Sequence, residues 1–323
     1  MAAKKQDEQE EKEQPLNIES VQYQGLTWMN IENPGSAEMD YLAKNYPFHP
    51  LDLDDCLSRI QRPKIDEYDD YLFMVFHFPI FNPDARVTTP SQLSVFISEK
   101  YLITLHNGEL KPLVKLFKEN QLEEEAREEC FSLGPGYLLY LIIDRLVDYC
   151  LPILNKIGDN IEKVEDDIFA ATLPKAIKEI SVLRRDVISF RRIIWPMRAV
   201  LAMLENRLKR FMKSDLSVYF QDMVDHVDRI WDGLNEYKEV IEGLNDTHDS
   251  LATNRLNDIM RVLTILATIG TTLTVVASFY GMNIPLPWGS NPGGSHWAWL
   301  SLLGIMLAMA GIMLLYFKKK SWL

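Results

Sequence analysis

The sequence predicts an α+β membrane protein, with an N-terminal α/β domain and a long helix that continues into the first of two C-terminal transmembrane helices. All 46 acidic residues and 31 of the 34 basic residues lie before residue 262. Two uncharged runs, 262–282 and 297–317, are long enough to cross a hydrocarbon core of about 30 Å. No proline lies between residues 215 and 281, so one helix can enter the membrane without interruption.

The first part of the chain alternates short apolar segments with turn signals. Segments rich in β-branched and aromatic residues predict strands at 71–80, 92–98 and 101–106. Amphipathic segments predict helices at 37–46 and 50–60. We therefore expect a cytoplasmic α/β domain over residues 15–136. Residues 1–14 lack the apolar core of a signal peptide and predict a disordered acidic tail.

The region 137–261 has apolar residues at helical spacing and predicts cytoplasmic helices. Pro152 is expected to kink the first of them, and a second begins at Pro174. The third, capped by Asp215, is expected to run to Gly281 as a stalk helix of about 67 residues, roughly 100 Å long. The alternative is two or three shorter helices separated by inconspicuous turns.

The charges next to the two apolar runs orient them in the membrane. Arg261 precedes the first run, Lys318 follows the second, and the connection contains no Lys or Arg. The positive-inside rule therefore places both termini in the cytoplasm. The expected order is a first span, the pore helix, at 262–282, an extracellular loop at 283–296, a second span at 297–317 and a basic cytoplasmic tail at 318–323.

One face of the first span is small or polar. A heptad spacing places on this face Asn257, Met260, Thr264, Ala267, Thr271, Thr274 and Ser278. Such a face either packs against a neighbouring helix or lines a water-filled axis built from several copies of the chain. Its hydroxyl and amide oxygens suit the water shell of Mg²⁺, which the ion loses reluctantly, better than a dehydrated soft metal.

Composition excludes several other classes of function. The formal net charge of −12 does not suit nucleic-acid binding. The sequence has no Gly-rich phosphate-binding loop and no arrangement of nucleophile, His and acid, so we expect neither an ATP-driven pump nor an enzyme. The three cysteines have no CxxC spacing, which suits a reduced cytosolic body without disulfides or a zinc site.

Several motifs together resemble one known family. They are Tyr280-Gly281-Met282-Asn283, the basic end from Tyr316 to Leu323, His49-Pro50-Leu51 followed by Gln61-Arg62-Pro63-Lys64, Ile194-Trp195-Pro196 with Arg198, and Tyr219-Phe220 with Asp222, Asp225 and His226. From about residue 25 onward the chain resembles the CorA-type magnesium transporters.

The resemblance implies a homopentameric funnel in the cell inner (plasma) membrane. It implies channel-like transport of hydrated Mg²⁺ into the cytoplasm, with Co²⁺ as a second candidate ion. By this resemblance the selectivity filter consists of Gly281, Met282 and Asn283. Pore-lining positions carried over from the family are Asn257, Met260, Leu263, Thr271 and Thr274. Cytosolic Mg²⁺, bound between subunits at Asp55 and Asp222, is expected to hold the pore closed.

The chain departs from the family pattern in two places near the pore. Many members have Met-Pro where this chain has Thr271-Thr272, and many have an acid after the GMN tripeptide, where this loop has none. A zinc or other divalent-cation transporter of the same superfamily is the alternative, although Met282 favours the magnesium branch. A two-span scaffold that binds partners through its acidic body is a hypothesis of a different class.

Overall fold

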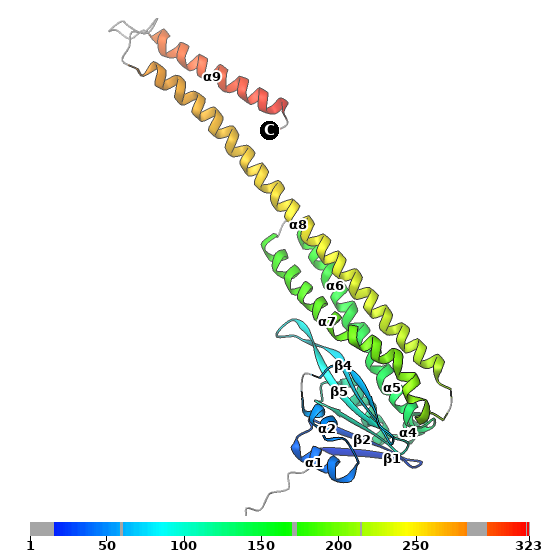
Figure 1. The fold of residues 1–323 in the computed structure, drawn as a ribbon. Coiled ribbons are helices and arrows are strands. Elements are labelled where there is room, and N and C mark those ends of the chain that lie inside the picture. The colour runs from blue at the N-terminus through cyan, green and yellow to red at the C-terminus, as the bar shows by residue number, and fades with distance from the viewer. Residues whose placement is uncertain are drawn as a thin grey trace, which may run out of the picture. The chain divides into compact units, whose positions relative to one another are not determined.

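The computed structural model describes residues 16–58, 61–169, 173–213, 215–282, 296–320 and 322, with positions 169, 173–176 and 296–299 described by their backbone. By its internal contacts the chain divides into two compact units between Asn245 and Asp246. The first unit contains a mixed sheet and most of the helices. The second contains the end of a long helix, α8, and one further helix, α9 (Figure 1).

The first unit is built on a six-stranded sheet in the order β1-β2-β6-β5-β4-β3. Its strands are β1 Ile18–Tyr23, β2 Leu26–Glu32, β3 Lys64–Glu67, β4 Leu72–Asn82, β5 Val87–Ile97 and β6 Tyr101–His106. Neighbours run antiparallel except β2 and β6, which are parallel. The three predicted strands correspond to β4, β5 and β6, the apolar centre of the sheet. The structure adds β1 and β2 on one side and β3 on the other.

Two prolines lie within the long β4–β5 hairpin, directly opposite each other. Pro79 of β4 pairs with Pro90 of β5. In β5 the pairing with β6 begins only at Leu93, and in β4 the pairing with β3 ends at Val75. Each proline therefore lies where its strand has a single neighbour, so its missing N–H removes no hydrogen bond from a second strand.

Helices α1 Ser36–Asn45 and α2 Pro50–Leu57 cover one face of the sheet, as the sequence predicts. Their buried side chains, Met39, Leu42, Leu53 and Cys56, share one core with strand residues such as Phe73, Phe96 and Ile103. His49 caps α2 by accepting the backbone N–H of Leu51, and Pro50 occupies the first turn, where no N–H is needed. The helix ends at Leu57, short of the predicted residue 60.

Helices α3 Lys111–Leu122, α4 Glu124–Phe131 and α5 Pro135–Asp148 follow, and then α6 Cys150–Phe169 and α7 Leu173–Leu208. On the face of the sheet opposite α1 and α2, Trp28 of β2 meets Phe117 of α3 edge to face, with ring centroids 4.9 Å apart. The kink predicted at Pro152 is instead a break at Tyr149. Pro152 lies in the first turn of α6, where the backbone N–H has no intrahelical partner and a proline costs little.

The stalk helix is continuous, as the sequence predicts. Helix α8 runs from Ser217 to Tyr280, 64 residues, and Asp215 accepts the backbone N–H of Ser217 at its start (3.0 Å). Within the first unit its buried residues recur three, four or seven positions apart: Phe220, Met223, Val227, Ile230, Leu234, Ile241 and Leu244. A Cβ at Gly158 of α6 would lie 2.4 Å from Tyr237 Oη, so a larger residue there would have to displace the Tyr237 side chain of α8.

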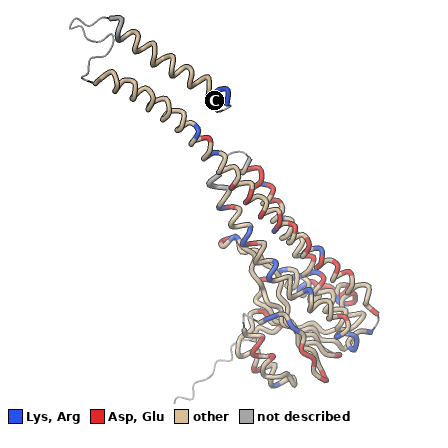
Figure 2. The backbone as a smooth tube through the Cα atoms, turned by 45° about the horizontal axis from the view of Figure 1, so that its top comes forward, with Lys and Arg blue, Asp and Glu red and all other residues tan. Residues whose placement is uncertain are grey.

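Both predicted apolar helices are present in the second unit. They are the last part of α8 and α9, which spans His296–Lys319. Figure 2 shows that charge disappears from α8 beyond its last basic position and returns at the lysines that end α9. Each helix has an apolar window that is only 6% buried, which is what a helix surrounded by lipid requires.

A buried carboxylate fixes α7 to the sheet and should make stability depend on pH. Asp186 is 4% exposed, and its Oδ1 accepts the backbone N–H of Thr88 at 2.5 Å. Burial raises the pKa of Asp186 despite this hydrogen bond. The stabilisation gained by its neutral form is therefore complete below the unfolded pKa of about 3.9 and is lost as pH rises through the folded pKa.

We expect Asp186→Asn to raise the melting temperature at pH 7, with a gain that shrinks toward pH 4, because asparagine stays neutral and keeps an acceptor for Thr88. Asp186→Leu is the control. It leaves the Thr88 N–H without a partner and should lose about 1–3 kcal/mol at every pH. Thermal unfolding of the purified chain from pH 4 to 7 measures both, and a gain independent of pH would contradict the assignment.

Candidate functional site

One face of α8 is exposed along nearly its whole length. Its positions alternate three and four residues apart, and every one of them is exposed: Asp222, Asp225, Arg229, Asp232, Glu236, Glu239, Gly243, Asp246, Ser250, Thr253, Asn257, Met260, Thr264, Ala267, Thr271, Thr274 and Ser278. We call this set the open face. It is mostly acidic before residue 247 and carries amide, thioether and hydroxyl groups after it.

The open face includes most of the predicted pore-lining positions. Leu263, beside it, is 57% exposed, so all eight predicted positions are exposed in the single chain. The opposite side of this segment is the covered one. Ile265 is 6% exposed, and Ile269 and Val276 are half-buried. Helix α9 runs beside this part of α8 in both views (Figures 1 and 2). The chain therefore covers a narrow strip of the apolar side of the first span, while Val262 and Phe279 on that side and the whole polar side stay exposed.

The threonine hydroxyls of this segment are bonded back to their own helix. Thr264, Thr268 and Thr272 donate to the carbonyls four residues earlier at 2.7–2.8 Å, and Thr274 donates likewise to Gly270. A hydroxyl that has donated its proton keeps lone pairs to accept hydrogen bonds. The sequence argument gave no role to Thr268, which its spacing of four from Thr264 could have signalled as a further exposed hydroxyl.

The predicted filter lies only partly within the described residues. Helix α8 ends at Tyr280, where Gly281 donates its N–H to the carbonyl of Ala277 (3.0 Å) and Met282 donates to that of Phe279 (3.4 Å). Met282 is 51% exposed. Asn283 and the rest of the predicted extracellular loop up to residue 295 lie outside the described residues.

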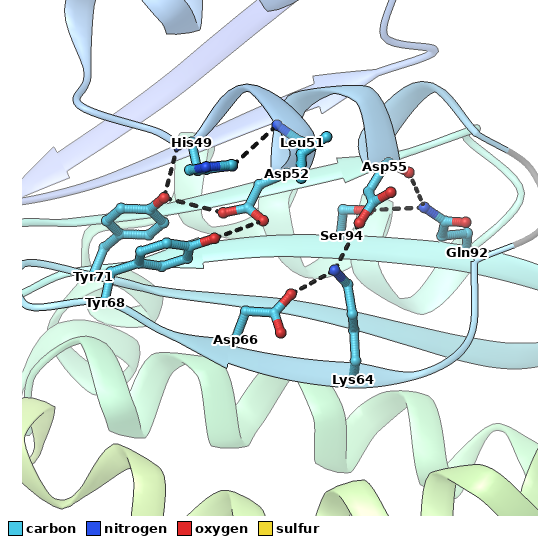
Figure 3. A network of polar contacts seen from close by, with 10 residues as sticks. All are labelled: His49, Leu51, Asp52, Asp55, Lys64, Asp66, Tyr68, Tyr71, Gln92 and Ser94. Carbon is cyan, nitrogen blue, oxygen red and sulfur yellow. Dashed lines mark hydrogen bonds and ion pairs between the residues drawn. The ribbon is translucent and has the colours of Figure 1, made fainter.

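Asp55, the first predicted regulatory carboxylate, is already engaged within the chain (Figure 3). Its Oδ2 lies 2.7 Å from Lys64 Nζ, which also pairs with Asp66 at 2.5 Å. Burial opposes the charge of Lys64, but its hydrogen bonds to Asp55 and Asp66 prevail and raise the pKa of Lys64. Asp55 on α2 is thus already ion-paired, and a metal ion would have to compete with the Lys64 ammonium group for it.

Asp52, one turn before Asp55, anchors the helix that carries Asp55. Asp52 is 1% exposed and accepts the hydroxyls of Tyr68 (3.1 Å) and Tyr71 (3.0 Å) (Figure 3). Tyr71 in turn accepts the backbone N–H of His49 at the start of α2. Burial raises the pKa of Asp52, and the two tyrosine hydroxyls partly offset this shift. No local pattern predicted this role, because it depends on how the turn between β3 and β4 approaches α2.

Asp222, the second predicted carboxylate, has a different environment. Its side chain is 64% exposed and lies on the open face, with Nε2 of His226 at 3.8 Å. His226 Nδ1 lies 3.4 Å from Asp148 of α5. Nearby, the pKa of Asp144 is raised by burial and by the charge of Asp148. The sequence argument missed this acidic pair of α5, which its spacing of four residues on one helix face could have signalled.

One chain does not assemble Asp55 and Asp222 into a metal site. The polar partners found for Asp55 are Lys64 and Gln92, whereas Asp222 is found beside His226. Among the residues that the structure describes, no group of three or more His, Cys, Asp or Glu side chains could hold a metal ion. A site that uses either carboxylate must therefore take ligands from another chain or from water.

The chain as a whole has counterparts among known proteins. The family model described as a CorA-like Mg²⁺ transporter protein matches residues 23–319. The chain belongs to this family. It is 30% identical over 306 residues to the cobalt/magnesium transport protein CorA of Thermotoga maritima, covering 92% of this chain and 83% of that protein.

A solved structure and a zinc transporter extend the comparison. The complete structure of the CorA magnesium transporter from Methanocaldococcus jannaschii matches with a TM-score of 0.81 and 25% identity, over 94% of each chain. The zinc transport protein ZntB of Yersinia pseudotuberculosis is 23% identical, over 92% of this chain and 88% of that protein. The fold predicted from the sequence is thus that of a CorA structure, with an N-terminal α/β domain, a long helix and two C-terminal apolar helices.

Proposed function

We propose that this chain conducts hydrated Mg²⁺, with Co²⁺ as a second substrate, into the cytoplasm along the axis of a homopentamer. The observation that carries the proposal is the open face of α8. It is uncovered from Asp222 to Ser278, acidic in its first part and lined by neutral oxygens in its apolar part. Two spans cannot enclose a pore, so several copies must bring their open faces together around one axis.

The chemistry of this face suits an ion that keeps its water. The water molecules around Mg²⁺ donate hydrogen bonds outward, and threonine oxygens whose protons are already donated to the backbone can accept them. The acidic part of the face lowers the potential for cations at the cytoplasmic end. The substrates named for the Thermotoga relative, cobalt and magnesium, support the same ions here.

The proposed filter and orientation follow the family. Gly281, Met282 and Asn283 would form the outer mouth, where the Asn283 amides of neighbouring copies hold the ion's water shell. The basic residues that flank the two apolar helices support cytoplasmic termini in a plasma membrane. The subunit number of five is part of the proposal.

Regulatory Mg²⁺ would bind at Asp222 in preference to Asp55. Asp222 is exposed, with His226 at 3.8 Å and the acidic Asp144 close enough to interact with it, whereas Asp55 is held by Lys64 at 2.7 Å. Facing carboxylates from adjacent copies repel each other until a cation lies between them. Cytosolic Mg²⁺ bound between these carboxylates would hold the subunits in a closed ring, and loss of the Mg²⁺ would let the ring open.

Uptake into proteoliposomes tests the substrate. We expect Mg²⁺ uptake driven by an inside-negative potential, with competition by Co²⁺. Proton-driven Zn²⁺ uptake with little Mg²⁺ movement would instead assign the function of the ZntB-like relative. Absence of any flux would favour a membrane scaffold.

Matched substitutions test the pathway. Thr274→Val, on the open face, should lower Mg²⁺ uptake by roughly tenfold, a change that corresponds to about 1.4 kcal/mol in the barrier. Thr272→Val is the control, because Thr272 makes the same backbone bond but is half-buried on the other side.

Asn283→Ala should abolish Mg²⁺ selectivity, whereas Asn254→Ala, off the open face, should not. If the two variants of a pair had equal effects, the assignment tested by that pair, pore lining for Thr274 or filter for Asn283, would be wrong.

Limited proteolysis tests the regulatory site. Asp222→Lys should abolish the protection that Mg²⁺ gives the cytoplasmic part, because the new ammonium replaces the cation. Asp249→Lys makes the same charge change on α8 but off the open face, and it should keep the protection. If both variants keep it, Asp222 is not the site.

A further inference from the structure

A large basic and aromatic cavity lies in the first unit, between α7, α8 and the segment before β3. Its volume is about 1220 Å³, enough for a drug-sized ligand. Gln61, Arg62 and Pro63 line one side, α7 contributes residues between Ile188 and Ala202, and α8 contributes residues between Val224 and Trp231. Two of the sequence motifs singled out above meet here, and the transport pathway uses neither.

The charge of the cavity is opposite to that of its surroundings. Arg62, Arg191, Arg192 and Arg198 line it, with Asp228 as the acid among the lining residues. Arg198 pairs with Asp228, at 2.6 Å between Nε and Oδ1. The other three guanidinium groups have no carboxylate partner in the part of the chain that the structure describes, and the buried Nε of Arg191 lacks a hydrogen-bond acceptor. Unpaired arginines gathered in an otherwise acidic protein indicate a site for an anion.

The same cavity presents aromatic rings to a ligand. Trp195 and Trp231 lie with ring centroids 5.0 Å apart, and Trp195 is 60% exposed. The guanidinium groups of Arg191 and Arg198 lie over the Trp231 ring, at 4.9 and 5.5 Å from its centroid. Arg198 also lies 5.9 Å from the centroid of the Trp195 ring, but Trp195 keeps most of its indole exposed beside the cationic groups, whereas Trp231 is stacked under two of them.

We propose that this cavity binds a nucleoside polyphosphate. Guanidinium groups match phosphate oxygens in a bidentate geometry and stay charged at every physiological pH. An exposed indole stacks on a flat base, an interaction that tolerates any base. Phosphate alone would explain the arginines but not the exposed tryptophan. The site is a binding site without hydrolysis, since the chain has no Gly-rich phosphate-binding loop.

A ligand in this cavity would contact the helix that forms the ion pathway. Asp228 and Trp231 belong to α8, and the ion pair between Arg198 and Asp228 joins α8 to α7. Phosphates bound to Arg198 would compete with Asp228 for its guanidinium group. The inference is independent of the proposed transport function, because binding is measured without flux.

Calorimetric titration of the purified full-length protein with ATP tests the inference. EDTA is present so that chelation of Mg²⁺ contributes no heat. We expect saturable ATP binding that weakens by roughly tenfold or more in Arg62→Gln and in Arg192→Gln, since each loses a charge-assisted hydrogen bond. Arg229→Gln, an exposed arginine of α8 outside the cavity, is the matched control and should bind as the wild type does.

Tripolyphosphate separates recognition of the nucleoside from recognition of phosphate. Trp195→Ala should weaken ATP binding and leave tripolyphosphate binding unchanged, and its high exposure makes loss of folding an unlikely cause. No ATP binding by the wild type, or equal losses in Arg229→Gln and the cavity variants, would overturn the site. Equal affinity for ATP and tripolyphosphate, unaffected by Trp195→Ala, would overturn the nucleoside assignment.

Discussion

The structure depends on one helix keeping a single register in two environments. In the first unit the buried positions of α8, such as Phe220, Ile230 and Leu244, recur three, four or seven residues apart. Continued at the same spacing, this series reaches Ile265, Ile269 and Val276, the positions covered in the second unit. The open face follows the same repeat on the other side. A heptad repeat of this length favours left-handed packing against neighbouring helices.

This register leaves one side of α8 exposed in a single copy. The covered side of α8 finds its apolar partners within the chain, against α6 in the first unit and on the side of α9 in the second. In the part of the chain that the structure describes, the open face stays exposed, with local polar contacts such as His226 beside Asp222 and Gln221 beside Asp225. Its acidic part carries like charges one or two turns apart, which repel unless cations or basic groups approach them. In its hydroxyl part, Thr264 and Thr274 donate to their own backbone, so these two side chains can face water inside a membrane with their protons already paired.

Local signals predicted what depends on local sequence. Strands β4 to β6 were predictable from their aromatic and β-branched residues, and α8 from the absence of proline. The exposed edge strand β1 and the short β3 lack such a signal. The pairing of Asp55 with Lys64 was not predictable, because it requires α2 to lie over β3. The basic cavity was beyond prediction for the same reason, since its arginines come from segments more than a hundred residues apart.

The chain divides into its two units within α8, so this helix belongs to both of them. Thr272 replaces a proline that many family members have near this position, and its backbone N–H remains available to the helix. Thr272 also donates its hydroxyl to the carbonyl of Thr268, a bond that bends a helix only slightly. Without a proline, α8 keeps its backbone hydrogen bonds through this position. The acid-rich half and the hydroxyl half of the open face therefore lie on one helix, and the spacing of three and four residues continues unbroken from one half to the other.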